Sequence, residues 1–323
     1  MVPGRQPPPH RSSTGNHYGE CLGKASAAAM SMRPIEIIGF ASGLGARNPG
    51  CAAGPDSMAQ SSLVPSLQQQ ACDIAWRTTL RPAAATSPLA GIQALCTSLA
   101  QEVGATINDG KLPLVIGGDH SCAIGTWSGA AQRFREQGPL GLIWIDAHMD
   151  SHTPETTPSG SIHGMPLAAL LGYGAPELVN IGSFSPKILP AHLCLIGIRS
   201  FESGEADLLR RLGVRIFFMD EIKQRGIAAV MAEALAIAQH GTVGFGISID
   251  LDAFNPKESP GVGTPVRHGL HHLALDKALA GIMHHPRLVA LELAEYNPRR
   301  DRNQLSLKLT ANLLSAFCRR VKN

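Results

Sequence analysis

Residues 141–150 read Gly-Leu-Ile-Trp-Ile-Asp-Ala-His-Met-Asp, and residues 243–252 read Val-Gly-Phe-Gly-Ile-Ser-Ile-Asp-Leu-Asp. In each segment a short apolar run, typical of a buried strand, leads into polar side chains at alternate positions. These side chains are Asp146, His148 and Asp150 in the first segment, and Asp250 and Asp252 in the second. Alternate residues of an extended chain project to the same side, so each set can meet at one point. Crowded carboxylates repel one another, and divalent cations would relieve that repulsion. The pattern therefore predicts a metal centre with more than one ion.

Similar apolar runs recur along the chain and predict further strands that are buried on both faces. We expect strands at Ile35–Phe40, Leu112–Ile116, Gly141–Asp146, Leu193–Ile198, Val214–Met219, Val243–Asp250 and Leu288–Leu293. Helical patterns lie between them, at Leu89–Val103, Ala123–Glu136, Gly204–Leu212, Asp220–Gln239, Leu273–Met283 and Arg302–Val321. Ala41–Pro65 and Ser151–Gly164 are expected as long connections. This alternation predicts an α/β fold with a mostly parallel sheet, in which functional sites gather at the carboxyl ends of strands.

The bulk properties limit the classes of protein that the chain can represent. Its 323 residues are 44% hydrophobic, which suits one large α/β domain. The net charge of +3 does not favour a nucleic-acid partner. No apolar run approaches the roughly 18 residues of a membrane span. The 7 cysteines are dispersed without a CxxC pair, so we expect reduced thiols in a cytoplasmic protein.

The amino-terminal segment differs in composition from the rest of the chain. Met1–Ala29 is rich in Pro, Gly, Ser and His and contains a single acid, Glu20. We expect residues 1–33 to be a disordered extension and residues 34–323 to form the folded domain. A transit-type segment is a less favoured alternative. Translation from Met30 or Met32 would remove the extension.

A further histidine completes the predicted metal centre. Gly117-Gly-Asp-His-Ser121 follows the strand Leu112–Ile116 and places His120 at its carboxyl end. The candidate ligands are then His120, Asp146, His148, Asp150, Asp250 and Asp252. Four carboxylates and two imidazoles suit Mn²⁺ better than structural Zn²⁺, and two divalent ions would balance the four acids. Taken singly, each residue could instead be a structural histidine, a helix cap or part of a surface ion pair.

These three motifs resemble the metal motifs of the ureohydrolase family, which contains arginases, agmatinases and related guanidino- and formimino-hydrolases. The likeness extends to Gly50–Pro55, Gly263–Pro265 and Glu295–Pro298, and covers the chain from about Ile35 onward. It implies a three-layer αβα sandwich with a central parallel sheet of about eight strands. It also implies a small-molecule guanidino substrate, a binuclear Mn²⁺ centre that releases urea, and assembly as trimers or hexamers. Zinc-dependent deacetylases share the fold, but their single-metal site would not need both acid pairs and His120.

The resemblance assigns roles to individual residues. One ion would be held by His120, Asp146, Asp150 and Asp250, and the other by Asp146, His148, Asp250 and Asp252. His163 matches the family's proton-shuttling histidine, although a loop histidine could have only a packing role. Glu295 matches the carboxylate that pairs with the guanidinium, or could pair with Arg299 or Arg300.

The predicted substrate-binding residues are His152, Ser159, Ser161, Glu202 and Glu205. The two glutamates resemble the arginase acids that hold an α-amino group, but acids are also favoured at helix amino termini. His152 and Ser161 replace asparagines of the arginase carboxylate-binding loop, whereas Ser159 is retained. The likeness is greatest to arginases and implies hydrolysis of L-arginine to L-ornithine and urea. Alternatives are a guanidinobutyrase, an agmatinase, a formimidoylglutamase or a non-catalytic metal-binding relative.

Overall fold

Eight parallel strands form the central sheet, in the order β2-β1-β3-β8-β7-β4-β5-β6. The protein is described here by a computed structural model of residues 33–318, with side chains described to residue 316. The strands are β1 (Ile35–Phe40), β2 (Ile74–Leu80), β3 (Leu112–Gly117), β4 (Leu140–Ile145), β5 (Leu193–Ile198), β6 (Arg215–Phe218), β7 (Gly244–Asp250) and β8 (Leu288–Ala294). The predicted extension 1–33 lies outside the described residues except for Arg33, as do Met30 and Met32.

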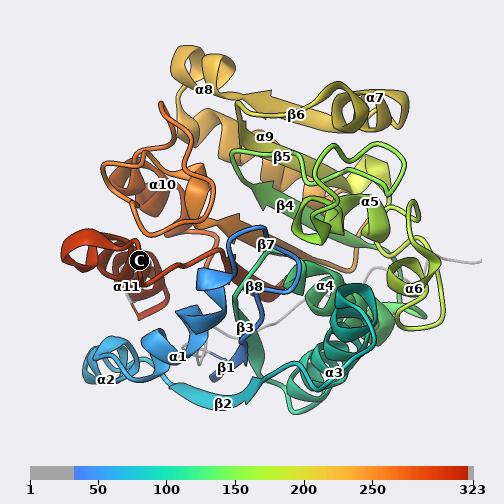
Figure 1. Cartoon of the computed structure of the whole chain (residues 1–323). Coiled ribbons are helices and arrows are strands. Elements are labelled where there is room, and N and C mark those ends of the chain that lie inside the picture. Colours follow the sequence, from blue (N-terminus) through green and yellow to red (C-terminus); the bar gives the residue numbers. More distant parts are fainter. Residues whose placement is uncertain (1–32, 319–323) are drawn as a thin grey trace, which may run out of the picture. The chain divides into compact units, whose positions relative to one another are not determined.

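Helices cover both faces of the sheet (Figure 1). They are α1 (Gly54–Ala59), α2 (Leu63–Gln69), α3 (Pro88–Asn108), α4 (Cys122–Phe134), α5 (Pro166–Leu170), α6 (Pro176–Val179), α7 (Ser203–Arg211), α8 (Met219–Arg225), α9 (Ile227–Gln239), α10 (His272–Leu279) and α11 (Leu305–Cys318). Residues of α3 to α7 share one core, and residues of α1, α2 and α8 to α11 share the other. The predicted three-layer αβα sandwich is therefore confirmed.

The alternating geometry of each strand explains why two cores form. In β4, Ile143 and Ile145 enter one core, whereas Leu142 and Trp144 enter the other. Every residue of this strand is buried, as its continuous apolar run predicts. Among residues 33–318, no helix is long and apolar enough to cross a membrane.

Three predictions about the elements were wrong. The strand β2 was not predicted, because its sequence Ile-Ala-Trp-Arg-Thr-Thr-Leu mixes polar and apolar residues at an edge of the sheet. The predicted helix Asp220–Gln239 is two helices, since Gly226 adopts a φ of 81° between α8 and α9. The predicted connection Ala41–Pro65 contains α1 and the start of α2.

Candidate metal centre

The predicted metal ligands and Glu295 lie at the carboxyl edge of four neighbouring strands, β3, β8, β7 and β4. His120 follows β3, Asp146 follows β4, and Asp250 is the last residue of β7. Glu295 directly follows β8. A parallel sheet brings these strand ends to a common edge, and in this way collects residues that are far apart in the sequence.

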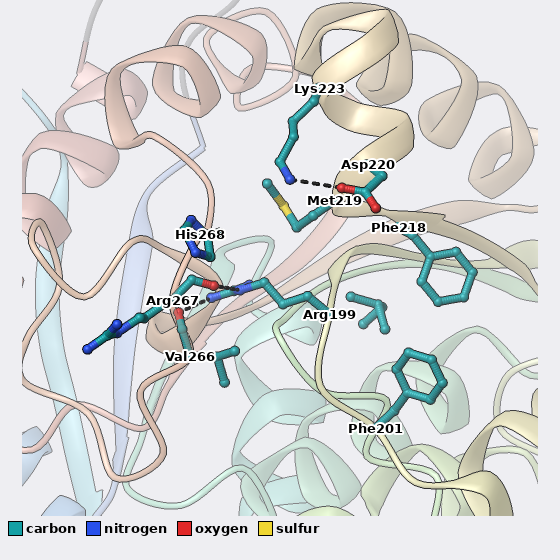
Figure 2. Close-up of a pocket in the computed structure, with 10 residues that line it drawn as sticks. Arg199, Phe201, Phe218, Met219, Asp220, Lys223, Val266, Arg267 and His268 are labelled. Carbon is teal, nitrogen blue, oxygen red and sulfur yellow. Dashed lines mark hydrogen bonds and ion pairs between the residues drawn. The ribbon is translucent and has the colours of Figure 1, made fainter.

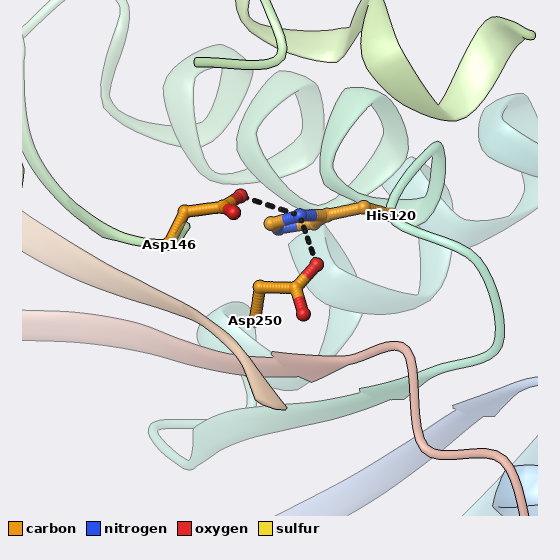
Figure 3. A group of neighbouring side chains, drawn as sticks. All are labelled: His120, Asp146 and Asp250. Carbon is orange, nitrogen blue, oxygen red and sulfur yellow. Dashed lines mark ion pairs between the residues drawn. The ribbon is translucent and has the colours of Figure 1, made fainter. Parts of the chain in front are cut away.

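The first group of donors surrounds one nitrogen atom of His120. Its Nδ1 lies 3.3 Å from Asp146 Oδ2, 3.1 Å from Asp150 Oδ2 and 3.1 Å from Asp250 Oδ2. Figure 3 shows the imidazole between Asp146 and Asp250. This nitrogen is buried and makes no hydrogen bond with any described residue. A buried nitrogen facing three carboxylate oxygens suits a bound cation, so the donor set fits a metal ion.

A second group of donors adjoins the first and shares Asp146 with it. His148 Nδ1 lies 3.6 Å from Asp146 Oδ1 and 3.1 Å from Asp252 Oδ2. Asp146 therefore presents one oxygen to each histidine, as a bridging carboxylate would. Asp250 contacts the first group through Oδ2, while its Oδ1 accepts a hydrogen bond from the Asp252 amide at 2.7 Å. The structure thus brings together all six predicted ligands in two adjoining groups.

The electrostatics of these groups reflect an excess of acid. Burial raises the pKa of Asp250, and the charges of Asp252 and Asp146 raise it further. Burial and Asp146 likewise raise the pKa of Asp150 to about 6. Burial alone would lower the pKa of His120, but its contacts with Asp146, Asp150 and Asp250 raise it overall. Bound cations would stabilise the ionised carboxylates, which is the charge distribution that metal coordination requires.

Three residues that the sequence analysis did not single out hold His120 and Asp146 in place. His120 Nε2 lies 2.9 Å from Ser248 Oγ, and this hydroxyl donates to the buried Glu292 Oε1 at 2.8 Å. Trp144 stacks on the His120 ring at 4.2 Å and donates from Nε1 to Asp146 Oδ2 at 3.0 Å. Backbone periodicity could have identified Trp144 and Ser248, which continue the alternation backwards from Asp146 and Asp250. Glu292 was detectable as a lone charge within an apolar strand.

His163 and Glu295 form a pair beside the first group. His163 Nδ1 lies 2.9 Å from Glu295 Oε1, which also accepts a hydrogen bond from the His120 amide at 3.0 Å. Burial alone would lower the pKa of His163, but Glu295 raises it to about 9. Burial would raise the pKa of Glu295, but His163 lowers it. Among the described residues Glu295 has no ion pair with an arginine, and Arg300 donates instead to the Val262 and Gly263 carbonyls.

The backbone near His163 and Glu295 has unusual φ values and specific hydrogen bonds. Asp150 and Glu295 have φ values of 47° and 68°, a region that side-chain-bearing residues seldom occupy, and such strain is often found at functional sites. Asp119 Oδ2 accepts a hydrogen bond from the Gly45 amide at 3.0 Å, and the Gly45 carbonyl accepts one from His163 N at 3.1 Å. A Cβ at Gly45 would lie 2.8 Å from Asp119 Oδ1, so this contact requires glycine.

The predicted substrate-binding residues separate into two sets. His152 Nε2 lies 3.1 Å from Glu202 Oε2 and 3.5 Å from Glu205 Oε2. Glu202 and Glu205 also form a capping box at the start of α7, so the helix-capping alternative holds alongside any binding role. Burial raises the pKa of Glu205 to about 8. Ser159 is exposed on a separate turn, where its hydroxyl accepts a hydrogen bond from the Ser161 amide at 3.2 Å.

The fold and the site together define an α/β protein with a carboxylate- and histidine-rich centre suited to metal ions. Comparisons with known proteins identify its family. The Arginase family model matches residues 33–320, and the chain belongs to this family. The arginase of Bacillus caldovelox is 38% identical over 296 residues, which are 88% of this chain and 98% of the relative.

Solved structures agree with this assignment. The crystal structure of Bacillus subtilis arginase has a TM-score of 0.83 at 34% identity and covers 90% of this chain and 99% of its own. The structure of Entamoeba histolytica arginase in complex with L-ornithine has a TM-score of 0.82 at 25% identity, and covers 90% and 99% of the two chains.

Proposed function

We propose that the protein hydrolyses the guanidino group of L-arginine to give L-ornithine and urea, and that it uses two Mn²⁺ ions per subunit. The observation that carries the proposal is the pair of adjoining donor groups that share Asp146. Membership of the Arginase family supports the reaction, and the Entamoeba relative was solved with L-ornithine bound.

The metal ligands follow from the two groups. His120, Asp146, Asp150 and Asp250 would hold one ion, and Asp146, His148, Asp250 and Asp252 would hold the other. When bound, such ions lower the pKa of water and supply a nucleophile at neutral pH. The donors are carboxylate and imidazole without thiolate, which favours Mn²⁺ among the common divalent ions.

Two residues would act on the substrate itself. Glu295 is buried and its pKa is lowered, so it can present a carboxylate to a guanidinium. His163 contacts this carboxylate at 2.9 Å and would therefore lie beside the bound guanidinium. An imidazole in this position can deliver a proton to the departing amine, which leaves more readily once it is protonated.

The far end of the substrate would meet His152, Glu202 and Glu205. Two acids favour an α-amino group, and the imidazole of His152, which contacts both, would be available to the substrate carboxylate. Ser159 and Ser161 lie farther along the same loop as His152, and we propose that their hydroxyls bind the substrate carboxylate. Because His152 contacts Glu202, a substrate with an amino group and no carboxylate, such as agmatine, is the second candidate.

A substrate panel tests this proposal. Mn²⁺-loaded protein should release urea from L-arginine far faster than from agmatine or 4-guanidinobutanoate, and should not release formamide from a formimino substrate. Turnover of another guanidine without turnover of L-arginine would contradict the assignment. The panel should be repeated with Ni²⁺, Co²⁺ and Zn²⁺ to test the metal preference.

The variant His152→Asn tests whether His152 contacts the substrate carboxylate. If His152 contacts the substrate carboxylate, this variant should change the KM for L-arginine and leave the KM for agmatine nearly unchanged. Equal changes for both substrates would show that His152 acts through Glu202 instead.

We also propose a cytoplasmic location and a homo-oligomeric state. The thiols of Cys51, Cys96, Cys122 and Cys194 are buried and form no disulfide, as expected of a protein kept in a reducing compartment. Cell fractionation tests the location, and light scattering of the purified protein tests for trimers or hexamers.

A further inference from the structure

The guanidinium of Arg199 joins three segments of main chain beside the metal centre. Arg199 directly follows β5 and donates hydrogen bonds only to carbonyl oxygens among the described residues. The acceptors are Gly197, Asp252, Ala253, Phe254, Val266 and Arg267. Figure 2 shows Arg199 reaching toward Val266 and Arg267. Among the described residues Arg199 makes no ion pair, so its close polar contacts are these hydrogen bonds to carbonyl oxygens.

One of these contacts is made to a predicted metal ligand. Arg199 Nη2 donates to the Asp252 carbonyl at 2.7 Å, and to the Val266 carbonyl at 2.9 Å. The Asp252 side chain is held separately, because its Oδ2 accepts a hydrogen bond from Thr264 Oγ1 at 2.9 Å. Thr264 lies in the same loop as Val266. Arg199 therefore fixes both the main chain of Asp252 and the loop that orients its side chain.

We propose that Arg199 is a positioning residue that sets the affinity of the group Asp146, His148 and Asp252 for its metal ion. This inference rests on the proposed metal centre and adds a determinant outside the predicted ligands. The group around His120 has a different support, through Ser248 and Glu292. The two ions should therefore respond differently to a change at Arg199.

Only arginine can make this set of contacts. Its planar guanidinium carries five donors in a fixed arrangement, so it can bind several carbonyls that approach from different segments. The ammonium of lysine concentrates three donors at one point and cannot span the same acceptors. Arg199→Lys therefore keeps the positive charge and removes the geometry.

The test is a titration of Arg199→Lys with Mn²⁺. Calorimetry measures the affinity for each ion, and electron paramagnetic resonance distinguishes a coupled pair of ions from a single ion. We expect one ion to bind with unchanged affinity and the other to bind about 10–100-fold more weakly. Excess Mn²⁺ should restore the coupled signal and most of kcat. A matched control is Arg287→Lys, because Arg287 also binds carbonyls, of Gln239 and Thr242, but just before β8 at the opposite edge of the sheet. The control should bind both ions normally.

Thr264→Val gives a second route if Arg199→Lys does not fold. Thr264 is exposed, so its replacement should leave the fold intact, and the same ion should be weakened. Two tight ions in Arg199→Lys, or in Thr264→Val if only that variant folds, would overturn the inference. An equal weakening of both ions would also overturn it, since it would indicate a general loss of structure. If the unaltered protein binds fewer than two ions, the proposed metal centre itself fails.

Discussion

The carboxylates at the two edges of the same sheet have different partners. At the amino edge, Glu36 near the start of β1 contacts Lys111 at 2.6 Å and Arg77 at 2.6 Å. At the carboxyl edge, Asp146 and Asp250 meet only histidines in their ion pairs. Glu36 is therefore neutralised by the chain's own cations, whereas the carboxylates at the carboxyl edge would be neutralised by the metal ions proposed above.

The largest effect is expected at the carboxyl edge, where several carboxylates lie close together. Asp250→Asn removes an acid of the first donor group, so Mn²⁺ should be lost. Urea release should then fall by at least about 10⁴-fold, because bound metal stabilises the transition state by several kcal/mol. Without metal, the same variant should melt no lower than the unaltered protein, since one buried repulsive charge is gone. Metal analysis and melting with and without Mn²⁺ measure both effects.

A matched control for this variant is Asp207→Asn, at an exposed position on α7. It should retain both metal content and activity. Full metal occupancy in Asp250→Asn would contradict the proposal that the carboxylates at the carboxyl edge bind metal ions.

The next effect concerns proton transfer at the carboxyl edge. His163→Ala should lower kcat by about 10²–10⁴-fold while both ions stay bound, because the general acid is lost and no ligand is removed. His192, just before β5 at the amino edge, provides the comparison: His192→Ala should leave kcat unchanged. Steady-state kinetics with L-arginine would measure both, and an unchanged kcat in His163→Ala would reject the assigned role.

A smaller effect is expected in the layer behind the ligands. Ser248→Ala breaks the link between His120 Nε2 and Glu292, and should weaken Mn²⁺ binding by about 10–100-fold. Ser128→Ala is a suitable control, because Ser128 is also buried but its hydroxyl has no hydrogen-bond partner among the described residues. Calorimetric titration measures the affinity of both variants for Mn²⁺. Equal affinities would contradict a role of Ser248 in holding His120.

The smallest effect is expected at the amino edge of the sheet, where Glu36 is paired with Lys111 and Arg77. Burial alone would raise the pKa of Glu36, but hydrogen bonds from Lys111 and Arg77 lower it overall. Its contribution to stability should therefore be present above the ordinary glutamate pKa of about 4.3 and lost as the pH falls through the lowered value. Glu36→Gln should cost about 1 kcal/mol or less at neutral pH and nothing in strong acid. Urea denaturation at several pH values measures this, and a cost that persists in acid would rule out the charge as its cause.

The sequence predicted which polar side chains lie close together, because each set lies at or directly after the end of a buried strand of the parallel sheet. Strand alternation itself does not continue through the ligands, because β4 ends at Ile145, Asp150 has a φ of 47° and Asp252 lies in the 3-10 helix Leu251–Ala253. The parallel sheet then brings β4 and β7 side by side. Alternating strands and helices predict a parallel sheet, but they do not determine this strand order. The same logic did not extend to β2, since an edge strand need not be apolar throughout.

Contacts that depend on folded carbonyl groups could not be predicted in the same way. Arg199 donates to residues 53 and 68 positions away, and nothing in the identity of Asp252 or Arg267 marks its main-chain oxygen as an acceptor. Glu202 and Glu205 present a related difficulty. Their sequence pattern suits both substrate binding and helix capping, and the structure places them where both are physically compatible.

The stacking of Trp144 on His120 gives the centre an intrinsic optical reporter. The indole lies 4.2 Å from the imidazole and donates to Asp146, so its excited state is directly exposed to changes in charge at the shared carboxylate. The chain has 3 tryptophans, and neither Trp76 on the edge strand nor Trp127 in α4 stacks on one of the predicted ligands. Fluorescence quenching can thus follow ion entry in real time, in the absence of any substrate.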